Sequence, residues 1–356
     1  MTTEVERVTT SKRTLEPKVL WLTAAASFLV SLGVFVVLAM GGLTAGFDIV
    51  ATVIWAAVLY VALSYVMSRI VEGKRKATDR LVAGVVTSAF VIALLPLISL
   101  IYTTVADGLN RLDGTFFSSS MRNIVGEGGG GLHALIGTLE VTLAASIISI
   151  PIGIMTAIYL VEYGRGKLAQ AVTFLIDVMT GIPSIVAGLF AFALFAIFFG
   201  PGIRFGIGGA VALSLLMIPV VVRSTEEMLK LVPNELREAS YALGVPKWLT
   251  VVKVVIPTAI GGIITGVMIA ISRIIGETAP LLIIAGLSTN MNYDLFNDRM
   301  TTLPVFVYTQ YANPGRDAQA YLDRAWTGAL VLILIVMALN IIARILAKVL
   351  APKGQR

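Results

Sequence analysis

Two charged residues, Arg273 and Glu277, interrupt a stretch that is otherwise apolar enough to lie in lipid. Residues 272–282 read SRIIGETAPLL and follow the apolar run VVIPTAIGGIITGVMIAI. A charge at the centre of a membrane helix costs roughly 2.5–3.5 kcal/mol on insertion scales, so such residues mark a functional site or a partner. The i, i+4 spacing predicts that the two side chains share one helix face, a single turn apart.

Two roles are open for this pair. It can neutralise itself against another helix, which would only make the span insertable. Alternatively it faces a translocation path, where the planar donors of Arg273 accompany an oxyanion and Glu277 compensates the arginine once the anion has left. Pro280 removes a backbone donor and disfavours helix at Ala279, so the helix should bend or end near the charges.

The rest of the chain predicts an all-α, polytopic membrane protein. Of its 356 residues 57% are hydrophobic and 13% charged, against roughly 25% charged in a soluble domain. Apolar runs of about 20 residues recur, each long enough to cross a bilayer as a helix. The chain has no cysteine and one histidine, so no metal site or other cofactor is expected. The net charge of +6 is attributed to topology rather than nucleic-acid binding.

Lysine and arginine predict the direction of the spans. With the N-terminus inside, 19 of the 27 fall on cytoplasmic segments and six outside, which favours a plasma-membrane protein with both termini cytoplasmic. The outer loops are 105–133, whose glycine run is either flexible or an anion-binding nest, and 287–325. His133 is expected at the membrane interface. The eight predicted spans are about 19–42, 46–68, 81–104, 134–161, 172–199, 206–229, 254–286 and 326–348.

A cytoplasmic segment between the sixth and seventh spans looks like a docking helix. Pro233 suits its start, Gly244 its C′ position, and Pro246 prevents continuation. The helical face is too small to hold the segment on lipid head groups and suits a groove in another protein. At spacing i, i+3, i+4 and i+7 this face consists of Leu236, Ala239, Ser240 and Leu243.

The same segment resembles the EAA loop of ABC-importer permeases. Glu238 to Gly244 reads EASYALG and is followed by VVIP at 254–257. It departs from the family pattern with Ser240 for alanine, Val254 for isoleucine and Ile256 for leucine, while the spacing is intact. Together with DVMTGIPSIVAGLF at 177–190 and SRIIGETAPLL, residues 81–350 resemble the A-type permease subunit of the bacterial phosphate-specific ABC importer.

This resemblance implies a six-span type I ABC-importer permease core at 81–350, with an EAA-like loop at 230–257. A cytoplasmic tail (1–18) and an extra transmembrane hairpin with a basic loop (19–80) precede it. It also implies partners: cytoplasmic ATPase subunits, a C-type permease and a periplasmic phosphate-binding protein, besides membrane lipid. The chain itself lacks the G-x-x-x-x-G-K-[ST] phosphate loop, so it is not expected to be an enzyme, and ATP hydrolysis should lie on the partners.

The resemblance also assigns roles to residues of this chain. The translocation path would hold Arg273, Glu277 and, as a second candidate, Arg223. Arg223 lies near the cytoplasmic end of its span, where it can instead snorkel or pair with Glu226 or Glu227, and Asp177 is a weaker candidate for gating. The ATPase-docking residues would be Glu238, Ala239, Ser240, Leu243 and Gly244.

Other functions stay open. An ABC permease with a different cargo, such as sulfate, molybdate or an amino acid, would share every feature above except phosphate-stimulated ATP hydrolysis. A self-sufficient secondary transporter or channel would work without an ATPase. A membrane scaffold or sensor would tolerate neutralisation of Arg273.

Overall fold

The computed structural model describes residues 15–42 and 48–350, so most of the predicted tail 1–18 and the start of the second predicted span lie outside the described residues. Within these ranges every regular element is a helix, as predicted. In chain order the elements are α1 (Pro17–Met40), α2 (Ile49–Val71), α3 (Lys74–Gly108), α4 (Gly114–Ser118), α5 (Leu132–Ile158), the π-helix η1 (Tyr159–Tyr163), α6 (Gly166–Thr180), α7 (Ser184–Phe199), α8 (Gly206–Lys230), α9 (Asn234–Ala242), α10 (Lys247–Thr250), the π-helix η2 (Val251–Val255), α11 (Ile256–Ile274), α12 (Ala279–Ile284), α13 (Leu303–Ala312) and α14 (Ala318–Leu350).

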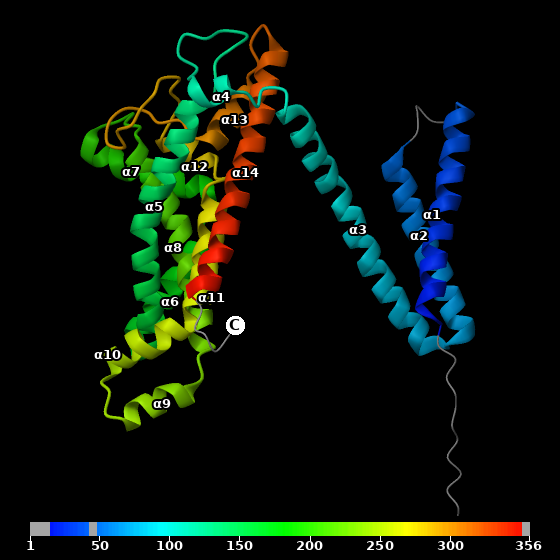
Figure 1. Cartoon of the computed structure of the whole chain (residues 1–356), viewed down its shortest axis with the longest axis horizontal. Coiled ribbons are helices and arrows are strands. Elements are labelled where there is room, and N and C mark those ends of the chain that lie inside the picture. Colours follow the sequence, from blue (N-terminus) through cyan, green and yellow to red (C-terminus); the bar gives the residue numbers. More distant parts are fainter. Residues whose placement is uncertain (1–14, 43–47, 351–356) are drawn as a thin grey trace, which may run out of the picture. The chain divides into compact units, whose positions relative to one another are not determined.

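Among the described residues, seven helices are long and apolar enough to cross a membrane, and the bent pair α6–α7 makes an eighth if it counts as one span. The contacts between α5 and α8 favour counting it. The Ser214 hydroxyl donates to the carbonyl of Ala145 at 3.4 Å, and Gly153 packs against Val221, so the two helices run parallel. The chain between them must therefore return across the unit, and the α6–α7 pair is the segment that does so (Figure 1).

One of the spans is broken, and a second break follows the span that ends with α11. The α6–α7 pair bends by 109° at residues 181–183, where the sequence GIP supplies two helix-breaking residues. The other break separates α11 from α12. The helices that follow the two breaks pack together, because α12 lies so close to α7 that a methyl group at Gly188 would be 2.5 Å from Cα of Pro280. Irregular backbone of this kind is tolerated in a membrane only where protein or a cavity surrounds it.

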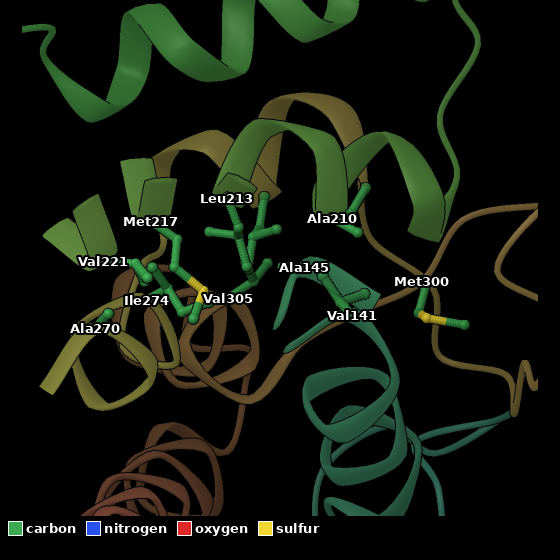
Figure 2. Close-up of a cluster of buried hydrophobic side chains, with 12 residues drawn as sticks. Val141, Ala145, Ala210, Leu213, Met217, Val221, Ala270, Ile274, Met300 and Val305 are labelled. Atoms are coloured by element: carbon green, nitrogen blue, oxygen red, sulfur yellow. The ribbon is translucent and has the colours of Figure 1, made fainter. Parts of the chain in front are cut away.

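The core that holds these helices together is built from small and branched apolar residues (Figure 2). Ala145 of α5, Met217 of α8 and Ala270 of α11 are fully buried in it. Close backbone approach through small residues is the usual way that membrane helices associate, since lipid is as apolar as the helices themselves. The core thereby fixes α11, the helix that carries Arg273, against α5 and α8.

The segment between α12 and α14 contains an element that the sequence did not predict. Helix α13 lies inside the predicted loop 287–325, with Leu303 and Phe306 buried. His133 is also buried, 4% exposed, with its ring edge-on to Phe306 at 5.5 Å, so its side chain packs within the protein, and its depth at the membrane interface stays a prediction. A cavity of about 820 Å³ is lined by His133, Arg299 and Gln310 among others.

The glycine run of the loop before α5 is held by two arginines. Arg324 donates to the carbonyls of Gly126 (2.7 Å) and Gly128 (3.0 Å), and Arg111 donates to that of Gly129 (2.8 Å). An anion nest needs N–H groups that converge on a ligand, whereas here the carbonyls face cations inside the protein. The loop is therefore pinned in place, which supports neither a nest nor the flexible loop expected from its composition.

The chain divides into two compact units, residues 1–103 and 104–356. In the N-terminal unit, Glu72 lies in the turn between α2 and α3, and its carboxylate contacts the start of α1. Its side chain is fully buried and pairs with Arg80 at 2.5 Å, and it accepts hydrogen bonds from Ser68 (2.6 Å) and from the backbone of Leu15 (2.9 Å). The hydrogen bond from Arg80 is the main reason that the pKa of Glu72 falls from 4.5 to about 2. Because the pKa is lowered on folding, this stabilisation is complete above pH 4.5 and disappears as the pH falls toward 2.

We expect Glu72→Gln to destabilise this N-terminal unit by about 1–3 kcal/mol, the usual loss for hydrogen bonds to a charged group. The variant leaves Arg80 without its counter-charge. Limited proteolysis of the detergent-solubilised protein should then cut at the α2–α3 turn faster than in the wild type. The control is Glu16→Gln. Glu16 precedes α1, but its carboxylate is exposed and makes no capping hydrogen bond to that helix. Equal cutting rates in all three proteins would contradict the assigned role of Glu72.

Candidate functional site

Arg273 lies in the last turn of α11, and its side chain is exposed on the surface of the subunit. Ala270 and Ile274, which lie about 60° and 100° around the helix from Arg273, are 0% and 1% exposed, so Arg273 stands at the edge of the buried face of α11. On the other side of Arg273, Thr265 and Ile269 are exposed as well. A cation in the last turn is favoured by the helix dipole, but an arginine that faces lipid is costly.

Glu277 is not on the same helix as Arg273, so the predicted face with one turn between them is wrong. Helix α11 ends at Ile274, and Glu277 lies half-buried in the break before α12. Within the described part of the chain no ion pair of 4 Å or less joins the two charges. The predicted end of the helix near the charges is confirmed, and Pro280 takes a first-turn position in α12. A self-neutralising pair therefore does not explain why Arg273 is present.

Arg223 belongs to a separate charge network near the other end of the core. It pairs with Asp177 of α6 and, at 3.0 Å, with Glu226 of its own helix. Glu226 pairs in turn with Lys230 at 2.7 Å. The predicted partner Glu226 is confirmed, while no ion pair is found for Glu227 among the described residues.

The two candidate arginines lie at different depths. Gly266 of α11 packs against Ser224 of α8, and Gly262 packs against Met228, so the helices are antiparallel. In this register Arg273 is level with Met217, six residues from Arg223. At 1.5 Å per residue that is a separation of about 9 Å along the helix axis. The structure therefore does not bring Arg223 and Arg273 together at one point.

The predicted docking helix is present as α9, and its ends are formed as the sequence indicated. Pro233 precedes it, and Gly244 adopts φ +74°, a conformation that side chains rarely tolerate. The N–H groups of Gly244 and Val245 donate to the carbonyls of Tyr241 (2.9 Å) and Ser240 (3.2 Å). This is the Schellman pattern that terminates helices.

The exposed face of α9 differs from the predicted face by one residue. Leu236 and Leu243 are 42% and 83% exposed, and Ala239 and Glu238 are exposed as well. Ser240 is buried instead, and its hydroxyl bonds to that of Thr250 at 2.8 Å. Ser240 therefore holds α9 to α10 and is removed from the docking surface, because a docking surface requires accessible side chains.

Sequence comparison identifies the family. The family described as "Binding-protein-dependent transport system inner membrane component" matches residues 149–355, more than half of the chain. The chain belongs to this family. The match runs from the middle of α5 through α14 and contains α9, Arg273 and both helix breaks.

The relatives most similar to this chain include proteins named as permeases. The phosphate transport system permease protein PstA 1 of Mycobacterium tuberculosis (strain H37Rv) is 46% identical over 259 residues, which is 72% of this chain and 83% of the relative. PstA of Mycobacterium leprae is 44% identical over 281 residues, 78% of this chain and 90% of the relative. Among solved structures, the inward-facing MetNI methionine ABC transporter covers 61% of this chain and 94% of its own, with a TM-score of 0.50 and 20% identity. This likeness confirms the fold of an ABC-importer permease.

The sequence missed two contacts at the end of the core near α9. Asp177 was considered for gating, but its pairing with Arg223 was not predicted. Arg237 of α9 and Glu162 of η1 form a buried ion pair across 75 residues of sequence. In the sequence, the one signal for this pair is that Arg237 takes an inward position on the amphipathic helix α9. That signal does not identify Glu162 as the partner.

Proposed function

We propose that this chain is the permease subunit of an ATP-driven importer and moves inorganic phosphate inward across the plasma membrane. The observation that carries the proposal is the 46% identity to a phosphate transport system permease over 83% of that relative's length. At this identity, over most of both chains, the role of the relative is the best-supported role for this protein. ATP hydrolysis takes place on separate cytoplasmic subunits.

Arg273 supplies the counter-charge for the anion in this proposal. An unpaired doubly charged phosphate cannot enter a medium of low dielectric constant without a large free-energy cost. The exposed position of Arg273 on α11 places the guanidinium outside the subunit's own core, where a second permease subunit would cover it. The alternative of exposure to lipid would cost roughly 2.5–3.5 kcal/mol for the arginine.

Glu277 and Arg223 take secondary roles. Glu277 lies in the break two residues before α12, close enough in sequence to offset Arg273 when no anion is bound. Arg223 is already neutralised by Asp177 and Glu226, so it is less available to an anion. We assign Arg223 and Asp177 to the cytoplasmic end of the path, where their pairing links α6 to α8.

Docking of an ATPase subunit is assigned to the exposed face of α9, with Glu238, Ala239 and Leu243 as contact residues and Gly244 as the residue that shapes its end. The further partners are a C-type permease and a periplasmic phosphate-binding protein. With eight spans both termini are cytoplasmic, which puts α9 on the side where ATP is available. Residues 19–80 form a hairpin added to a permease core at 81–350.

Purification of the tagged chain with its partner subunits tests the proposal. We expect an ATPase to co-purify, and its turnover in proteoliposomes to rise with phosphate together with the phosphate-binding protein. Sulfate or molybdate offered with the same components is the control. Stimulation by one of these anions and not by phosphate would favour a different cargo. Phosphate uptake without any ATPase subunit would favour a secondary transporter.

A further inference from the structure

The docking helix α9 is attached to the rest of the subunit mainly through two polar side chains. Arg237 and Ser240, at positions i and i+3, point inward, while Leu236, Ala239 and Leu243 are exposed. Ser240 bonds to Thr250 of α10, which continues through η2 into α11. Arg237 is the side chain that links α9 to α5 and α8.

Arg237 of α9 reaches two further elements with one guanidinium. Its Nε and Nη2 donate to Oε1 of Glu162 at 3.0 and 2.9 Å, and Glu162 lies in η1, which directly continues α5. The same side chain donates to the carbonyls of Leu229 (2.9 Å) and Val232 (2.6 Å) at the end of α8. The last carbonyls of a helix lack partners within that helix, so they are available to such a donor.

The second end of the docking loop is fastened to the same place. Lys247, the first residue of α10, donates to the backbone carbonyl of Glu162 and lies 4.9 Å over the ring of Tyr163. Both ends of the loop therefore converge on residues 162–163. The side chain of Glu162 is only 5% exposed and that of Arg237 12%, so water does not screen the pair as it would on a surface.

We infer that Arg237 and Glu162 are positioning residues that transmit movement of α9 to α5 and α8. A buried ion pair is by itself weak support for a stabilising role, because apolar residues of similar volume stabilise as well or better. The planar fork of Arg237 does what an apolar residue cannot do, since it holds η1, the end of α8 and α9 at fixed distances at once. A pull on α9 would then reach α5 and α8 together.

This inference rests on the proposed function, since it requires an ATPase at α9. Its test is the ratio of phosphate transported to ATP hydrolysed in proteoliposomes containing the complete complex and its binding protein. Arg237→Lys keeps the charge but loses the fork. We expect assembly and ATP hydrolysis to persist while the ratio falls about tenfold, within the usual range of coupling between sites. Glu162→Gln retains an acceptor oxygen for Arg237 and should give an intermediate ratio.

The control is Arg165→Ala. Arg165 lies two residues after the same π-helix, is exposed and makes no capping hydrogen bond to α6 with its side chain, so its removal should leave the ratio unchanged. If Arg237→Lys lowered transport and hydrolysis in parallel, with the wild-type ratio kept, the pair would be merely structural and the inference would fail. A wild-type ratio and rate in both variants would overturn it too. Absence of phosphate-stimulated hydrolysis in the wild-type complex would instead refute the proposed function, and the inference with it.

Discussion

Arg273→Leu is expected to reduce the rate of phosphate uptake at least about 100-fold, which corresponds to an activation free energy higher by roughly 2.7 kcal/mol. Leucine suits a membrane helix, and Arg273 makes no ion pair within the described residues of this subunit. The fold and the complex should therefore survive, while the anion loses its counter-charge. Uptake of radiolabelled phosphate, together with co-purification of the partner subunits, measures both effects.

Two further variants sharpen this experiment. Arg273→Lys retains a cation but not the paired donors, so we expect partial activity. Arg344→Leu makes the same chemical change at an exposed arginine near the end of α14 and should transport normally. Unimpaired uptake in Arg273→Leu would remove this residue from the translocation path.

Gly244→Pro is expected to abolish coupling by destroying the end of the docking helix. Proline is fixed near φ −65°, whereas Gly244 adopts φ +74°. It also lacks the N–H group that donates to Tyr241 at 2.9 Å. Together these changes cost about 3 kcal/mol or more locally. We expect the ATPase to be lost from the purified complex and uptake to fall to background.

The matched control is Gly244→Asn, since asparagine tolerates the left-handed conformation better than other side chains. It should retain most of the coupling. Ala239→Asp offers a second test that leaves the helix ends intact. Ala239 is exposed on α9, so the substitution would place a charge in the contact with the ATPase subunit and weaken it. Co-purification and uptake that persist in both Gly244→Pro and Ala239→Asp would show that α9 is not the docking element.

Local signals in the sequence predicted much of the fold. Apolar runs predicted the membrane helices, and α9 begins after Pro233 and ends before Gly244 because proline and glycine act on their own backbone. The break after α11 was also predictable, since Pro280 restricts the residues next to it. In each case the cause lies within a few residues of the effect.

Features that depend on distant residues could not be predicted in this way. The burial of Ser240 is set by Thr250 in the next helix, and helical periodicity does not show which positions meet a neighbour. The exact end of α11 at Ile274 separates Glu277 from Arg273, although the i, i+4 spacing suggested one face. Helix α13 was missed because Asp294, Asp298 and Arg299 precede it and made the whole region look like a solvated loop.

We propose that the exposed side of α11 around Arg273 lines a water-accessible path between two permease subunits. The chain has no cysteine, so Ile269→Cys, one turn from Arg273 and 57% exposed, gives a single thiol on this face. Val86→Cys on the apolar surface of α3, where Val86 is 64% exposed, is the control.

Labelling of the assembled complex with a membrane-impermeant methanethiosulfonate reagent, applied from both sides, is the most direct measurement. We expect Ile269→Cys to react with the reagent and to be protected from it when phosphate and the binding protein are present without ATP. We expect Val86→Cys to remain unlabelled. If Ile269→Cys reacted only with a lipid-soluble maleimide, as a residue facing the bilayer does, Arg273 would not face a translocation path.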